Sequence, residues 1–232
     1  MNLRKQIVMV RKIKQAKEYK DKASMTENSD RAIERYDKSI SLLKQVVKQD
    51  EIEVLKVVHT GNLRDSEANR CAVFASKFFD AAISLSGGER ADCLKKAAEC
   101  SLAASSIRME AAEVAREYGG LAAYYNTLSH VYLDGAFHPY YLAWAADAVG
   151  DLDDALSNYK KALSTLKTAL EHFDKSLQMK PSRDMEEGRK HYLEYMGWCR
   201  LGIREVEFKM QSGGVTKKRT KRKRKQITET DR

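Results

Sequence analysis

Proline and glycine, the residues that most often break helices, are scarce in this sequence. Its 232 residues include two prolines, at 139 and 181, and twelve glycines, several of them paired at 87–88, 119–120 and 213–214. Because breaks are confined to so few points, long helices are expected to fill the intervals. The sequence therefore predicts an all-α fold of stacked helical hairpins or three-helix bundles.

Long apolar runs are also absent. The first apolar run, at residues 7–10, is four residues long and lies between basic pairs. A membrane-spanning helix needs about 20 predominantly apolar residues. We therefore expect no signal peptide and no membrane span, and a soluble protein.

Cysteine and histidine are few and scattered, which argues against a metal site or an enzyme. The four cysteines, at 71, 93, 100 and 199, have no CxxC spacing, and the five histidines have no HExxH spacing. Free thiols favour a reducing compartment, so an intracellular location in the nucleus, the cytoplasm or both is expected. The residues 85–90 (LSGGER) match an ATPase signature loop, but no GxxxxGK[ST] accompanies them, and a helix break capped by Ser86 and Glu89 explains them. No catalytic, cofactor-binding or metal-binding residue is predicted.

The net charge of +9 is concentrated at the two ends of the chain. Residues 1–22 carry a net charge of +6 and residues 215–232 carry +7, so the body between them is acidic, at about −4. The basic composition therefore describes two terminal segments and not a basic surface over the fold.

A segment near the start of the chain is repeated near its end. Residues 31–50 align with residues 154–173 at a constant offset of 123, with identities that include Ala32/Ala155, Tyr36/Tyr159 and Leu43/Leu166. The shared apolar positions recur at steps of three and four, which is one face of an α-helix. Self-similarity of this kind is typical of stacked helices that present a groove to another protein.

Local signals predict where the individual helices begin and end. A first helix over residues 3–23 is expected to pack through a stripe that includes Ile7 and Val10, and a second one begins at Ser29 as its N-cap. Breaks are expected at residues 61–62, 119–120 and 134–135, and Pro139 is expected to open a new helix. One helix of about 28 residues runs from residue 152 towards Pro181, and the last helix covers residues 184–210.

Two helical families resemble parts of this pattern. Residues 150–163 (GDLDDALSNYKKAL) resemble the second half of a tetratricopeptide repeat, although the helix continues where that repeat expects a proline. Residues 140–210 resemble the microtubule-interacting-and-transport (MIT) domain, and residues 7–82 are a looser second copy. The resemblance implies three-helix bundles that bind short motifs of filament-forming proteins in the ESCRT membrane-remodelling pathway. It divides the chain into a bundle at 1–83, alanine-rich connecting helices at 84–138, a second bundle at 139–211 and a tail at 212–232.

The last predicted helix carries large apolar residues on the side opposite its main apolar stripe. We expect Trp198, Leu201 and Phe208 to anchor a short helical or extended peptide, with Arg200 and Arg204 as charge partners. The alternative is that the alanine-rich middle of the chain packs over these side chains. The oligomeric state is left open.

The C-terminal tail has the densest charge in the chain. Eight of the nine residues from 217 to 225 are basic, they follow a Ser-Gly-Gly segment, and we expect them to be disordered. A nuclear-import signal read by an importin-type receptor is the preferred interpretation. Nonspecific phosphate contacts with RNA or DNA and an anionic membrane patch are the alternatives. These residues are Lys217, Lys218, Arg219, Lys221, Arg222, Lys223, Arg224 and Lys225.

The sequence therefore predicts a non-enzymatic adaptor that binds peptide motifs through a helical groove. The competing prediction is a nucleic-acid-associated factor in which the tail supplies phosphate affinity. The partner protein and its pathway are not readable from the residues.

Overall fold

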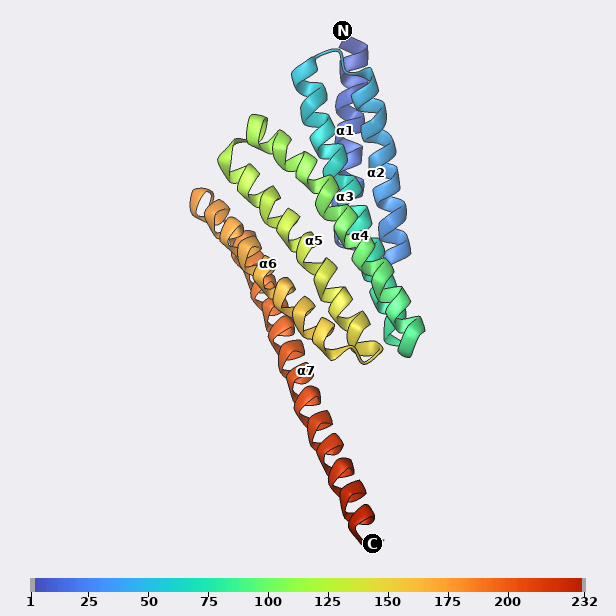
Figure 1. Ribbon diagram of the computed structural model, residues 1–232. Coiled ribbons are helices and arrows are strands. Elements are labelled where there is room, and N and C mark those ends of the chain that lie inside the picture. Colours follow the sequence, from blue (N-terminus) through green and yellow to red (C-terminus); the bar gives the residue numbers. More distant parts are fainter. Residues whose placement is uncertain (1–2, 231–232) are drawn as a thin grey trace.

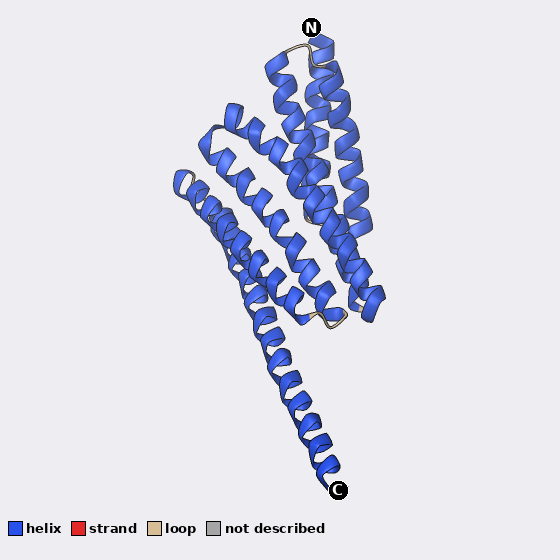
Figure 2. Ribbon diagram, in the orientation of Figure 1, coloured by secondary structure: helices blue, strands red, loops and turns tan. Residues whose placement is uncertain are grey.

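The computed structural model describes the backbone of residues 3–230 and the side chains of residues 5–212. Within the described backbone there are seven α-helices and one π-helical turn and no β-strand, which confirms the all-α fold (Figure 2). None of the described helices is long and apolar enough to cross a membrane. The elements are α1 (Leu3–Ser24), α2 (Ser29–Gln49), α3 (Glu53–Ile83), α4 (Gly87–Val114), the π-helix η1 (Ala115–Gly119), α5 (Gly120–Ala148), α6 (Leu152–Met179) and α7 (Arg183–Thr230).

Each helix packs against the next one along the chain, and consecutive helices run in opposite directions (Figure 1). The odd-numbered helices therefore run parallel to one another. Among the described residues, the side-chain contacts that skip a helix join odd-numbered helices. Examples are Lys20–Asp65 between α1 and α3, Phe79–Tyr141 between α3 and α5, and Ser129–Tyr192 between α5 and α7. The odd-numbered helices thus form one face of the molecule, with grooves between them that the even-numbered helices underlie.

The two copies of the sequence repeat become α2 and α6, and they are buried in the same way. Ala32 and Ala155, Tyr36 and Tyr159, and Leu43 and Leu166 are all buried. The non-identical positions agree as well, because Ser39, Ala162, Val46 and Ala169 have no exposed surface. The repeat therefore marks the even-numbered helices that pack beneath the odd-numbered face at each end of the chain.

Alanine dominates the main core, which extends from α3 to α7. Ala97, Ala98, Ala143, Ala155 and Ala162 are fully buried within it. Such small side chains let helix axes approach closely, and larger residues fill the remaining space. A smaller core joins α1, α2 and α3 at the N-terminal end.

Two of the breaks expected from the sequence are wrong, because α3 and α5 continue through them. A Cβ atom at Gly61 would lie 2.8 Å from Val114 Cγ1, and one at Gly135 would lie 3.3 Å from Ser105 Oγ. These glycines therefore permit close contact with α4 and do not end helices. Pro139 lies inside α5 and does not open a new helix. A proline inside a helix destabilises it by about 3 kcal/mol, because its N–H is missing. Burial of neighbours such as Tyr140 and Tyr141 stabilises the fold by roughly 1.5–3 kcal/mol for each large side chain and offsets this loss.

Several helix ends agree with the sequence, whereas some details differ. The helix α6 has the expected length of 28 residues, and its N-cap Asp151 accepts a hydrogen bond from the Asp154 N–H. The N-cap of α2 is Asn28 and not Ser29, since the Asn28 side chain accepts from the Arg31 N–H at 3.0 Å. Ser86 is the N-cap residue of α4, but its side chain forms no capping hydrogen bond. In α1, Met9 and Ala16 are buried, whereas Ile7 and Val10, expected in the inner stripe, are 44% and 63% exposed.

The tail and the domain divisions stay predictions. The helix α7 is continuous to Thr230, through the segment expected to be disordered, and the side chains of residues 213–232 lie outside the described ones. The expected division after residue 83 falls at the turn between α3 and α4, and the division after residue 138 falls inside α5. One apolar core extends across both positions.

Candidate functional site

An apolar groove lies between α5 and α7 on the odd-numbered face, and we call it the α5–α7 groove. Its volume is about 370 Å³. Trp198 and Leu201, two of the anchors expected from the sequence, line it and are 43% and 55% exposed. Phe208 is 71% exposed and lies outside the groove, further along α7. The groove is lined by Phe79, Tyr140, Trp144, Tyr159, Trp198, Leu201, Gly202 and Glu205.

A glycine brings α7 against the floor of this groove. Gly202 is buried, and a Cβ atom at that position would lie 2.5 Å from Cζ of Tyr159 on α6. Because real Cβ contacts are longer than this, only glycine lets the α7 backbone approach the tyrosine ring. The neighbouring Leu201 and Trp198 are then held at the edge of the groove.

Aromatic contacts fix the groove walls. Phe79 and Trp144 make an edge-on contact at 5.5 Å between ring centroids, and Tyr195 meets Trp198 edge-on at 5.0 Å. Burial raises the pKa of Tyr140 to about 12, so its phenol stays protonated at neutral pH. Apart from Glu205, the walls are therefore apolar and uncharged, which suits apolar anchor side chains of a ligand.

The two arginines expected as charge partners differ in position. At about 100° of rotation per residue, Arg204 lies within about 60° of both Leu201 and Phe208. Measured from Trp198, Arg204 lies at about 120° and Arg200 at about 160°, so Arg204 is the nearer of the two to the groove. Neither arginine forms an ion pair with any residue whose side chain is described. The geometry therefore favours Arg204 over Arg200 as a partner for charge on a ligand.

A second cavity lies between the N-terminal halves of α3 and α5, and we call it the α3–α5 cleft. Its volume is about 530 Å³, and polar and apolar side chains from α1, α3, α4, η1 and α5 line it. Arg108 of α4 lies at its floor, where it is only 5% exposed. No local sequence pattern predicts this cleft.

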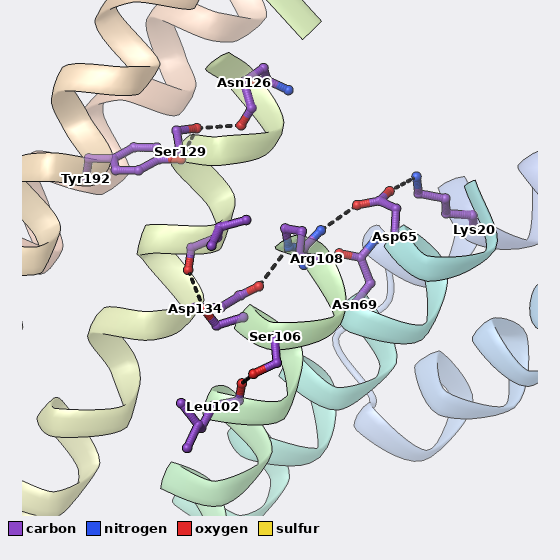
Figure 3. A network of polar contacts seen from close by, with 12 residues as sticks. Lys20, Asp65, Asn69, Leu102, Ser106, Arg108, Asn126, Ser129, Asp134 and Tyr192 are labelled. Atoms are coloured by element: carbon purple, nitrogen blue, oxygen red, sulfur yellow. Dashed lines mark hydrogen bonds and ion pairs between the residues drawn. The ribbon is translucent and has the colours of Figure 1, made fainter. Parts of the chain in front are cut away.

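Arg108 is the centre of an ion-pair network that links four helices (Figure 3). Its Nε donates to Asp134 Oδ2 of α5 at 2.7 Å, its Nη1 donates to Asp65 Oδ1 of α3 at 2.5 Å, and its Nη2 donates to Asn69 Oδ1 at 2.8 Å. Lys20 of α1 donates to the other oxygen of Asp65. Positive and negative groups therefore alternate from α1 to α5.

Burial and charge act in opposite directions on the members of this network. Burial raises the pKa of Asp65, but the charges of Lys20 and Arg108 outweigh it, so the pKa is lowered and the carboxylate is ionised. Burial also raises the pKa of Asp134, and Arg108 offsets this only in part. In His130, which lines the same cleft, burial and the Arg108 charge lower the pKa to about 4, so the ring is neutral at pH 7.

One feature of the sequence indicates a buried ion pair in α4. Arg108 is a single basic residue among Ala103, Ala104, Ala111 and Ala112, in a helix whose alanines are mostly buried. A buried arginine needs carboxylate partners. The sequence alone does not say which of the 33 acidic residues supply them.

The basic residues 217–225 of the tail lie outside the residues whose side chains are described. Their role as an import signal or a phosphate-binding segment stays a prediction. In comparison with known proteins, no family model matches this sequence and no curated protein matches it either.

Proposed function

We propose that this protein is a non-enzymatic adaptor that binds a short amphipathic helix of a partner protein in the α5–α7 groove. The observation that carries the proposal is the position of Trp198 and Leu201, which line an apolar groove and stay exposed. Exposed large apolar side chains beside a preformed groove are typical of protein interaction sites.

The form of the ligand follows from the chemistry of the groove. The described chain is helical and offers no strand edge to which an extended segment could add. Recognition through the groove therefore depends on side chains, and apolar residues at i, i+3 or i+4 and i+7 of a helix fit an elongated aromatic surface. Arg204, which lies beside Leu201 and forms no ion pair among the described side chains, favours an acidic residue on one side of the apolar anchors, and Glu205, which lines the groove, favours a basic residue on the other.

The finer fold assignment belongs to the same proposal. The end of α5 with α6 and α7 is a three-helix unit that resembles an MIT domain, and the antiparallel stacking of neighbouring helices resembles tetratricopeptide hairpins. Both resemblances support a protein-binding role, since arrays of this kind present grooves to peptide ligands.

The test is an affinity purification from cell extract at low and high salt. It uses the intact chain, the 1–212 truncation, and the double variant Trp198→Ala/Leu201→Ala in the full chain. Leu121→Ala is the matched control, because Leu121 is 60% exposed and does not line the groove. We expect one partner protein to be recovered at high salt, with the truncated chain and with the control variant. It should not be recovered with the double variant.

A helical peptide from that partner must then bind the purified protein with the same dependence on Trp198 and Leu201. A partner that binds the double variant as well as the intact chain would refute the groove as the binding site.

The alternative function is association with nucleic acid through the tail, and the run of eight basic residues in nine favours it. Contacts between lysine or arginine and phosphates release counterions, so this affinity falls steeply as salt concentration rises. Recovery of nucleic acid at low salt only, and only with the intact chain, supports this alternative. A nuclear-import role predicts instead that removing residues 213–232 moves the protein out of the nucleus.

A further inference from the structure

The α3–α5 cleft is a second concave site, away from the α5–α7 groove. The two share no lining residue, because the cleft lies along residues 58–69 of α3 and 123–130 of α5, whereas the groove begins at Phe79 and Tyr140. At about 530 Å³ the cleft is within the range of about 300–1,000 Å³ that ligand sites occupy. The π-helix η1 forms part of its rim, and π-helical turns are frequent at functional sites.

The charged groups at the floor of the cleft satisfy one another. Lys20 and Arg108 pair with Asp65, and Arg108 also pairs with Asp134, so two positive and two negative groups balance (Figure 3). His130 adds no charge at neutral pH. The floor therefore offers neither an unpaired cation for an anionic ligand nor an unpaired carboxylate for a cationic one.

Two neutral side-chain amides of the cleft walls have no hydrogen-bond partner among the described residues. The side-chain amides of Asn62 on α3 and Asn126 on α5 line the cleft, and neither forms a hydrogen bond with another described residue. The Asn69 carbonyl oxygen accepts from Arg108, which leaves the N–H groups of that amide available. A carboxamide both donates and accepts, so Asn62, Asn69 and Asn126 supply neutral donors and acceptors on two parallel helices.

We propose that the α3–α5 cleft binds the main chain of an extended peptide segment. An extended segment carries free N–H and C=O groups on both sides, which complement carboxamides, whereas a helical segment has used these groups internally. Val58, Val114 and Ala123 also line the cleft and can pack against alternate side chains of the segment. The site differs in place and in ligand form from the α5–α7 groove, so it does not depend on the function proposed for that groove.

The test begins with a library of random twelve-residue peptides displayed on phage and selected on the full chain. Selected sequences are synthesised with acetylated and amidated ends, which removes both terminal charges. Their affinities are measured by fluorescence anisotropy for the intact chain, Asn62→Leu/Asn126→Leu and Trp198→Ala/Leu201→Ala. Gln15→Leu is the matched control, because Gln15 is an exposed amide on α1 that does not line the cleft.

We expect a class of peptides that loses about tenfold or more in affinity with the cleft double variant, as expected for two lost hydrogen bonds. The groove variant and the Gln15→Leu control should leave this class unchanged. Methylation of a single main-chain nitrogen at the centre of the peptide should cause a similar loss, because it removes an N–H donor without changing the side chains.

A second variant guards against a folding defect in the double variant. Asn62→Asp keeps the size and an acceptor and removes the donor, and it should weaken the same peptides while thermal unfolding by circular dichroism stays cooperative. Three results would overturn the proposal: no peptide is selected, every selected peptide depends on Trp198 and Leu201 alone, or binding requires a free carboxylate and disappears with amidated ends.

Discussion

Acidification should destabilise the protein through His130, which lies in the polar cleft against charged groups from three other helices. Burial, Arg108 of α4 and Lys20 of α1 lower its pKa to about 4, and Asp65 of α3 opposes them. An unfolded chain binds the proton with a pKa of about 6.5. Between pH 6.5 and pH 4 the unfolded state therefore holds more protons, so the free energy of unfolding falls as the pH falls through this window.

The size of this effect follows from the two pKa values. Linkage gives a loss of about 2 kcal/mol between pH 7.5 and pH 5 for a shift from about 6.5 to about 4. Because the His130 ring is only partly buried, solvent screens part of the interaction, and we expect about 1–2 kcal/mol. Above pH 7.5 the contribution should be constant.

The assay is urea unfolding at pH 7.5, 6 and 5 for the intact chain, His130→Asn and His191→Asn. His191 is the control because its side chain is 66% exposed. His138 and His172, whose pKa values burial also lowers, act equally in all three proteins. An equal loss of stability between pH 7.5 and pH 5 in His130→Asn and in the intact chain would show that His130 does not carry this pH dependence.

Three substitutions test the packing and the ion pairs. Arg108→Met leaves Asp65 and Asp134 without their buried partner, and urea unfolding at pH 7.5 should show a loss of about 3–5 kcal/mol; a loss below about 1 kcal/mol would mean that the network is not formed. Gly202→Ala forces a Cβ atom against Tyr159, and overpacking of about 1–3 kcal/mol should exceed the helix-propensity gain of about 1 kcal/mol, so thermal unfolding should move to lower temperature. Gly197→Ala, where a Cβ atom meets nothing within 4 Å, is the matched case and should raise the unfolding temperature; equal effects at the two glycines would contradict the close approach of α7 to Tyr159.

The sequence predicts the class of the fold and the helices whose apolar periodicity is strong. The repeated stripe correctly predicts two amphipathic helices, α2 and α6, because matched residues such as Tyr36 and Tyr159 are buried on one face of each helix. The length of α6 is also correct, since Asp151 and Pro181 are local start and stop signals. Prediction from the sequence fails where the role of a residue depends on which residue of another helix packs against it. Gly61 and Gly135 are indistinguishable from helix breakers until Val114 and Ser105 are placed against them.

The two candidate sites also differ in how far the sequence predicts them. Trp198 and Leu201 could be identified because they lie off the apolar stripe of a single helix, which periodicity reveals. Arg200 is close to Trp198 in the sequence, but helical rotation puts it on another side of α7. The α3–α5 cleft was missed because its residues come from four helices, and no local pattern joins Lys20, Asp65, Arg108 and Asn126.

The ion-pair network also has a consequence for how the molecule opens. Most packing in this chain joins consecutive helices, so a terminal helix can detach without disturbing distant ones. Lys20, Asp65, Arg108 and Asp134 instead connect α1, α3, α4 and α5 at one point. The amide hydrogens of these four helices should therefore exchange with solvent in one cooperative unit.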